Sequence, residues 1–139
     1  MPDVDGRRRE IIDGEIVEIV RAGYIHKLVK ANLTEILASW LAQNRIGKFF
    51  VETSYRLEEH WAPILDLSVL PRERPDPVTQ SLIRGAPELA IEVVSSDAAE
   101  YLLSKVQAYL KHGSAAVWIV FPDQRVVQVY TKSMQRNSG

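Results

Sequence analysis

The sequence predicts an α/β fold that borders on α+β, with helices on the faces of a mixed β-sheet. An apolar stripe with helical spacing runs through residues 24–43, and several shorter segments are rich in the β-branched and aromatic residues typical of strands. Residues 88–121 follow the order strand, helix, strand, which predicts a right-handed parallel crossover. The 139 residues fit one domain, 1–139.

The first elements predicted are a hairpin and a long helix. Residues 10–20, EIIDGEIVEIV, place Asp13-Gly14 between two apolar runs, which is a strong signal for a two-residue turn. The helix over 24–43 has an apolar face made of Ile25, Leu28, Val29, Leu33, Ile36, Leu37, Trp40 and Leu41. Its opposite face is polar and is expected to be solvated: His26, Lys27, Lys30 and Thr34.

Two strands and a proline-rich loop are predicted in the middle of the chain. Residues 48–57 and 62–70 alternate in the manner of strands. In the second of them, Leu65, Leu67 and Val69 point one way, and Ile64, Asp66 and Ser68 point the other. Residues 71–87 contain several prolines and are predicted to form a surface loop.

The last part of the chain carries the crossover. Residues 88–94 form its first strand, and Ser95, Ser96 and Asp97 are candidate N-caps for a helix over about 98–112. This helix is expected to direct four residues inward: Leu102, Val106, Tyr109 and Leu110. Gly113 suits the position after its end, 115–121 and 125–130 are predicted strands, and the tail is expected to fray.

Composition excludes several classes of site. The chain has no cysteine, so thiolate zinc sites, disulfides and cysteine nucleophiles are excluded, and a cytoplasmic location is expected. No apolar run reaches the length of a membrane span, so no membrane partner is expected. The net charge of −1 argues against a broadly basic surface that coats nucleic acid, although a local basic cleft stays possible.

Two acids and a lysine are the candidates for chemistry. If the strands that carry Asp66 and Glu92 are neighbours, both carboxylates can project from one face of the sheet. Two half-buried carboxylates repel each other, and a Mg²⁺ ion relieves that repulsion by taking oxygen ligands. Lys105 lies two turns into the next helix, beside its apolar stripe. Such a set supports phosphodiester hydrolysis, in which the metal activates water and the lysine orients that water or stabilises charge on the phosphate.

Structural interpretations of the same residues stay open. Glu92 and Lys105 could form an ion pair without a catalytic role, in which case Lys105→Met would lower stability but not activity. Glu88, which follows a proline, is interpreted as a solvated residue at a strand end, and Trp40 and Trp118 as core residues.

In order and spacing, the motifs resemble the Uma2 family, also called DUF820, of restriction-endonuclease-like proteins. The resemblance covers most of the chain and rests on five segments: IIDGEIVEI, YIHKLVKANLTEILASWL with His26, LDLSVL with Asp66, PELAIEVVSSD with Glu92, and KVQAYLKHGSAAVWIVFPDQRVVQVY with Lys105, Tyr109, Gly113 and Trp118. Each segment is a weak signal alone, but together they are fairly specific.

The resemblance implies a restriction-endonuclease-like sheet and a site similar to that of PD-(D/E)XK nucleases. In that pattern the lysine would stand at Val94, and the resemblance implies that Lys105 replaces it. It further implies Asp66, Glu92 and Lys105 as catalytic residues. The implied ligands of Mg²⁺ or Mn²⁺ are Asp66, Glu92 and the Val93 carbonyl, and Glu15 and His26 are implied as outer-shell or substrate contacts.

The chain departs from the family pattern in several places. Leu65 stands where proline is usual, Glu88 where aspartate is usual, Ser96 where proline is usual and Phe121 where aspartate is usual. The chain is also expected to be shortened at its C-terminus relative to the family.

Two functions follow from these observations. The first is a Mg²⁺-dependent endonuclease acting on nucleic acid, DNA rather than RNA, and acting as a homodimer if it cuts both strands. The alternative is a catalytically inactive family member that binds nucleic acid or protein. A melting temperature that shifts with Mg²⁺ or Mn²⁺, but not in Asp66→Ala, would favour the first.

Overall fold

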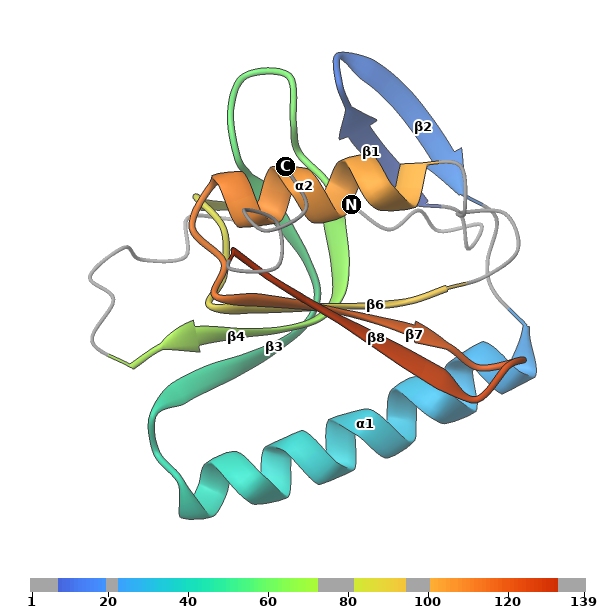
Figure 1. Ribbon diagram of the computed structural model, residues 1–139, viewed down its shortest axis with the longest axis vertical. Helices are drawn as coiled ribbons and strands as arrows, with labels where there is room; N and C mark the ends of the chain where they lie inside the picture. Colours follow the sequence, from blue (N-terminus) through green and yellow to red (C-terminus); the bar gives the residue numbers. More distant parts are fainter. Residues whose placement is uncertain (1–7, 20–22, 73–81, 95–100, 133–139) are drawn as a thin grey trace.

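The computed structural model describes residues 8–19, 23–72, 82–94 and 101–132. It has the mixed sheet and flanking helices that the sequence predicts, in an α+β arrangement (Figure 1). The elements in chain order are β1 (Arg8–Ile12), β2 (Glu15–Ile19), α1 (Tyr24–Gln43), β3 (Gly47–Arg56), β4 (Ile64–Pro71), β5 (Leu82–Arg84), β6 (Leu89–Val93), α2 (Leu102–Lys111), β7 (Ala116–Phe121) and β8 (Val126–Thr131).

The main sheet has six strands in the order β5-β3-β4-β6-β7-β8. Three neighbouring pairs are antiparallel, β3 with β4, β4 with β6 and β7 with β8. β6 and β7 are parallel and are connected through α2, so the predicted parallel crossover is confirmed. The sheet therefore brings Asp66 of β4 and Glu92 of β6 onto neighbouring strands.

β1 and β2 form a separate two-stranded sheet. Asp13 and Gly14 have φ values of 50° and 82°, the left-handed conformation that a type I′ turn requires at both central positions. Backbone hydrogen bonds between Ile11 and Ala62 hold this hairpin against the segment before β4. The hairpin predicted from Asp13-Gly14 is thus confirmed.

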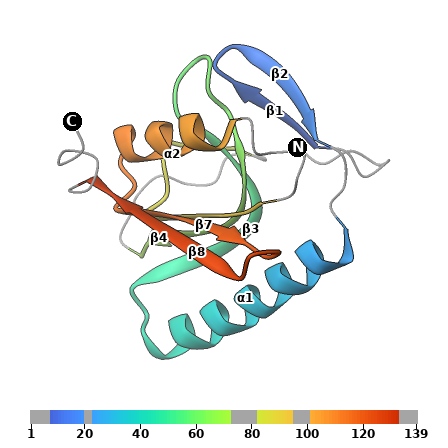
Figure 2. The ribbon, with the colours of Figure 1, turned by 45° about the vertical axis from the view of Figure 1, so that its right-hand side comes forward.

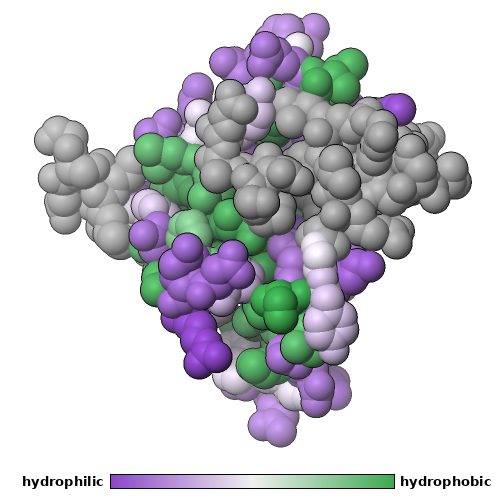
Figure 3. Space-filling view, turned by 90° about the vertical axis from the view of Figure 1, so that its right-hand side faces the viewer, coloured by the Kyte–Doolittle hydropathy of each residue, from purple (hydrophilic) through white to green (hydrophobic). Residues whose placement is uncertain are grey.

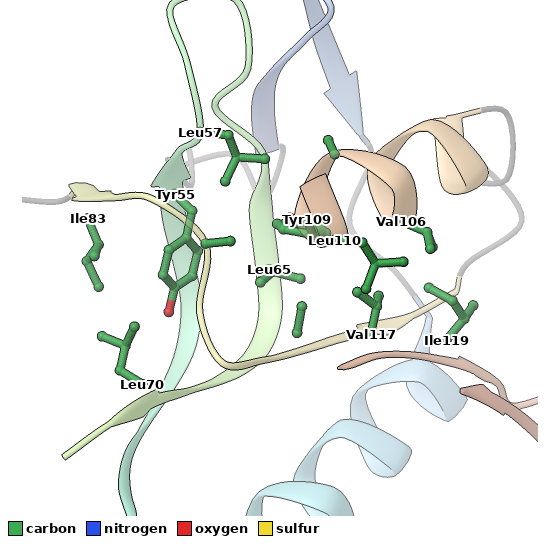
Figure 4. Close-up of a cluster of buried hydrophobic side chains, with 13 residues drawn as sticks. Tyr55, Leu57, Leu65, Leu70, Ile83, Val106, Tyr109, Leu110, Val117 and Ile119 are labelled. Atoms are coloured by element: carbon green, nitrogen blue, oxygen red, sulfur yellow. The ribbon is translucent and has the colours of Figure 1, made fainter. Parts of the chain in front are cut away.

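The helices cover opposite faces of the main sheet. α2 and the β1–β2 hairpin lie on one side, and α1 lies on the other (Figures 1 and 2). The larger apolar cluster fills the space between α2 and the sheet (Figure 4), and its largest fully buried members are Tyr55, Leu65, Ile83, Tyr109, Leu110, Val117 and Ile119. A smaller cluster of Leu67, Ile91, Val93 and Val120 packs towards α1.

The proline-rich loop predicted over 71–87 contains a strand that the sequence did not indicate. β5 pairs in parallel with β3, with Ile83 opposite Tyr55. Ile83 is fully buried, which explains why this short segment docks at the sheet edge. The two apolar residues that start β5 are too few to carry a periodic signal.

α1 begins and ends where the sequence predicts, but it contacts the sheet with a different part of its surface. Val29, Leu33 and Leu37 pack against the sheet, whereas Ile36 and Trp40 are 63% and 50% exposed. The interpretation of Trp40 as a core residue is therefore wrong, and several large apolar residues of α1 and β8 reach the surface. Figure 3 shows one face on which apolar side chains lie between hydrophilic ones.

Trp118, interpreted from the sequence as a core residue, is half-buried and packs against the smaller cluster from its edge. Gly113 has a φ of 120° at the position after His112, the C-cap of α2, as its predicted position requires. The candidate N-caps Ser95, Ser96 and Asp97 and the tail beyond 132 lie outside the described residues. Within the described part of the chain, neither helix has the length and apolar character that crossing a membrane requires.

Candidate active site

Asp66 lies where the strands β4 and β6 part. The ladder between them pairs Leu67 with Ile91, and the next position along β4 is Asp66. Its carboxylate is 3% exposed, and Oδ2 accepts a hydrogen bond of 2.8 Å from the backbone N–H of Val93. The Asp66 side chain thus serves the backbone of β6 in place of a strand partner.

His26 and Lys30 of α1 lie against the same position. His26 Nε2 donates to the carbonyl of Val93 over 2.6 Å and lies 3.9 Å from Asp66 Oδ2. Lys30 Nζ lies 3.4 Å from Asp66 Oδ1. These residues are one helical turn apart and share a face of the helix. The prediction that this polar face is solvated is wrong for both of them, because the face points into the sheet at the site.

Glu52 of β3 completes this half of the site. Its carboxylate Oε2 lies 2.5 Å from Lys30 Nζ, and its side chain is 44% exposed. The backbone of Glu52 has a φ of 45°, a left-handed conformation that is uncommon for a residue with a side chain. Sequence reasoning did not single out Glu52, because an acid in an alternating strand is normally solvated.

The other half of the site is a buried ion-pair cluster. Lys105 of α2 is 3% exposed and forms a salt bridge with Glu92 of β6. Its Nζ also donates to Oε1 of Glu10, a residue of β1, over 2.9 Å. The same oxygen of Glu10 accepts a hydrogen bond of 2.8 Å from the backbone N–H of Ile64. Lys105 therefore connects the crossover, the hairpin and the start of β4.

Glu10 is a second site residue, besides Glu52, that the sequence reasoning missed. It is 1% exposed, and its Oε2 has no hydrogen-bond partner among the described residues. The alternation of β1 contained a signal, since Glu10 shares a face with the buried Ile12 and so occupies a position where an apolar residue would be expected. By contrast Glu15, which the family resemblance implied, is exposed at the start of β2.

Burial and neighbouring charges set the protonation of two groups here. Burial by itself would lower the pKa of Lys105, but the charges of Glu92 and then Glu10, with their hydrogen bonds, outweigh it and raise that pKa above its ordinary value. Burial, followed by the charges of Glu92 and Glu10, raises the pKa of the Tyr109 hydroxyl well above 10.0. Lys105 is thus a permanent ammonium at neutral pH, and Tyr109 is a neutral phenol.

The two halves meet at the Glu92–Val93 peptide but approach it from opposite layers. The charged partner of Asp66, Lys30, comes from α1, whereas that of Glu92, Lys105, comes from α2 on the other face of the sheet. The sequence predicted instead that the carboxylates of Asp66 and Glu92 project from the same face of the sheet. The β3–β4 ladder pairs Val51 with Leu67 and Thr53 with Leu65, and Asp66 lies between these pairs, opposite the left-handed Glu52.

The charged groups of the site have a net negative charge that a bound cation would balance. Among the described residues that these ion pairs join, four carboxylates and two ammonium groups give a formal charge of −2 when His26 is counted as neutral; the members are Glu10, Glu52, Asp66, Glu92, Lys30 and Lys105. Among the described residues, no three His, Cys, Asp or Glu side chains form a cluster that could hold a metal ion. A metal would therefore have carboxylates, the Val93 carbonyl and water as ligands, which fits Mg²⁺, since it usually takes one or two carboxylates and keeps several waters.

Comparison with known proteins identifies what this architecture is similar to. Residues 1–138 match the model of the Uma2 family, described as "Putative restriction endonuclease". The fold matches a crystal structure from Anabaena variabilis described as "a putative nuclease belonging to DUF820", with a TM-score of 0.82 and 24% sequence identity. That match covers 94% of this chain and 75% of the other. No curated protein shows significant similarity to the chain.

Proposed function

The chain belongs to the Uma2 family, and we propose that it is a Mg²⁺- or Mn²⁺-dependent endonuclease that hydrolyses phosphodiester bonds of nucleic acid. The description of the family, "Putative restriction endonuclease", and that of the structural neighbour, "a putative nuclease", support this assignment. The observation that carries it is the formal charge of −2 gathered around the Glu92–Val93 peptide. A divalent cation would neutralise that charge.

Asp66, Glu92 and the carbonyl of Val93 are the groups that would hold the metal. They are hard oxygen donors on adjacent strands, and both carboxylates are buried. When bound, such an ion lowers the pKa of a water molecule and so supplies the nucleophile for hydrolysis.

Lys105 has the role of a fixed positive charge in this proposal. Two buried carboxylates hold its ammonium form, which has no free lone pair, so we assign it no role as a general base at neutral pH. The ammonium would orient the attacking water or stabilise charge that develops on the phosphate. Glu92 and Glu10 hold it in place from two sides. His26 orients the Val93 carbonyl through its hydrogen bond of 2.6 Å.

The alternative is a catalytically inactive member that binds nucleic acid or protein. One observation favours it, because each proposed metal ligand already has a partner within the chain. Lys30 lies beside Asp66, His26 donates to the Val93 carbonyl, and Lys105 pairs with Glu92. A protein that never binds metal would need such internal neutralisation permanently.

A homodimer is part of the proposal, because cleavage of both strands of a duplex needs two sites. The edge strand β8 supports it, since Val126, Val127 and Val129 are each more than two-fifths exposed. Exposed apolar edge strands are commonly covered by another chain. Sedimentation of the wild type beside a Val127→Lys variant tests this, and an unchanged monomer in both would contradict it.

The decisive test is cleavage of labelled single-stranded DNA, duplex DNA and RNA in Mg²⁺ and then Mn²⁺. Asp66→Asn removes one proposed ligand while keeping the side-chain volume. Glu88→Gln is the matched control, because Glu88 is an exposed acid directly before β6. We expect cleavage, with DNA preferred, by the wild type and by Glu88→Gln but not by Asp66→Asn.

Each outcome discriminates between the two functions. Metal-dependent cleavage that is lost in Asp66→Asn supports the nuclease. Cleavage that survives in Asp66→Asn would mean that the activity lies elsewhere or in a contaminant. No cleavage of any substrate by the folded wild type, together with retained nucleic-acid or protein binding, would support the inactive module.

A further inference from the structure

Lys30 is shared between two carboxylates on neighbouring strands. Its Nζ lies 2.5 Å from Oε2 of Glu52 on β3 and 3.4 Å from Oδ1 of Asp66 on β4. The side chain is 14% exposed, whereas that of Asp66 is 4% exposed. The ammonium therefore lies on the solvent side of the buried Asp66 carboxylate, and the more exposed Glu52 carboxylate is its nearer partner.

Features of β3, β4 and α1 hold Lys30 between the carboxylates of Glu52 and Asp66. Glu52 and Asp66 are opposite one another between two ladder pairs of β3 and β4, and like charges in such positions destabilise a sheet unless a cation lies between them. Glu52 also has the left-handed φ of 45°, a backbone conformation that is strained for a residue with a side chain. On the helix, Thr34 Oγ1 donates to the Lys30 carbonyl over 2.8 Å.

We infer that Lys30 is a tethered counter-ion that competes with a divalent cation for Asp66, and that Glu52 keeps the ammonium when Asp66 is taken by the metal. The inference deepens the proposed function and rests on it, because it concerns the same metal ligand. An ammonium 3.4 Å from a carboxylate oxygen repels any cation bound to that carboxylate. Glu52 gives the displaced charge a partner, so Lys30 stays close to the site.

This role differs from that of the second lysine. Lys105 is 3% exposed and is bound by two buried acids, so it stays in place whether or not metal is present. Lys30 has one weaker contact and one exposed partner. Lys105 is thus a fixed counter-ion of the site, whereas Lys30 is an exchangeable one.

The test is the affinity for Mn²⁺ itself, measured by calorimetric titration at fixed ionic strength without nucleic acid. Lys30→Met removes the competing charge, and we expect Mn²⁺ to bind at least about tenfold more tightly, which is the factor that Coulomb's law gives for a unit charge about 6 Å from a divalent ion at the dielectric constant of water, about 80. Lys27→Met, an exposed neighbour on α1, is the charge-matched control and should leave the affinity within about twofold of the wild type. Circular dichroism establishes that each variant is folded, and Lys30→Gln replaces the Met variant if that variant does not fold.

A double-mutant cycle separates exchange of partners from a general effect of charge. Glu52→Gln should weaken Mn²⁺ binding in the wild type, because Lys30 is then left with Asp66 alone. In the Lys30→Met background the same change should have a much smaller effect. Equal effects in the two backgrounds would overturn the role of Glu52.

The outcomes also distinguish this inference from the proposed function. Wild-type binding of Mn²⁺ that depends on Asp66, with no gain in Lys30→Met, overturns the counter-ion role and leaves the metal site standing. Absence of Mn²⁺ binding in both the wild type and Lys30→Met overturns both. Mn²⁺ binding that appears only in Lys30→Met supports the competition and assigns the wild type to the inactive alternative.

Discussion

The sharpest stability prediction concerns Lys105→Met. This substitution removes the cation between Glu92 and Glu10 and leaves two carboxylates that are 6% and 1% exposed without it. Breaking a buried ion pair by deleting one partner costs about 3–5 kcal/mol. This is a large part of the free energy of unfolding of a typical domain, which is about 5–15 kcal/mol. We therefore expect the midpoint of urea denaturation to fall steeply while the m-value stays constant.

Two further variants control this experiment. Lys111→Met removes an exposed lysine from the same helix and should change the free energy of unfolding by at most about 0.5 kcal/mol. A triple variant, Glu10→Gln, Glu92→Gln and Lys105→Met, removes the uncompensated charges together and should recover most of the loss. If Lys105→Met unfolds within about 1 kcal/mol of the wild type, the cluster is not a tightly coupled buried set and the reasoning is refuted.

Two other predictions follow from the burial of single groups. Stability should fall as the pH rises above about 10. In the unfolded chain, Tyr109 and Lys105 lose protons near their ordinary pKa values, whereas their raised pKa values let the folded chain keep these protons. Tyr109→Phe should make the fall in stability with pH shallower in urea titrations, and an unchanged slope would contradict this prediction. Gly47→Ala should destabilise by more than about 1 kcal/mol, because its Cβ would lie 2.6 Å from the Leu70 carbonyl oxygen. Gly23→Ala meets open space at the N-cap of α1 and should lower the thermal midpoint less than Gly47→Ala, so equal effects would argue against the close approach at Gly47.

Local signals in the sequence were enough for most of the fold. The Asp13-Gly14 turn, the limits of α1 and the crossover from β6 to β7 each depend on residues close together in the chain, and each is present in the structure. The segment of β5 was not predictable in this way. Its place in the sheet depends on the pairing of Ile83 with Tyr55, and a strand of three residues gives no local sequence signal for such a pairing.

The site was predictable only in part, for a physical reason. Asp66, Glu92 and Lys105 stood out because charges interrupted apolar patterns, but their partners come from other elements. The apolar residues of α1 spread around much of the helix, so the pattern could not tell which face would turn His26 and Lys30 towards the sheet. The local sequence around Glu10 does not indicate that its partner, Lys105, lies 95 residues away in the chain.

That separation has a consequence for how the protein folds. The Glu10–Lys105 contact spans 95 residues, and the His26–Val93 contact spans 67. Contacts this distant in sequence require large loops to close first, and an isolated two-stranded hairpin is at best marginally stable. The charged cluster should thus assemble after the rate-limiting step, so that changes at Glu10 give φ-values near zero. They would accelerate unfolding and leave the folding rate almost unchanged, which makes the proposed catalytic centre a determinant of the lifetime of the native state.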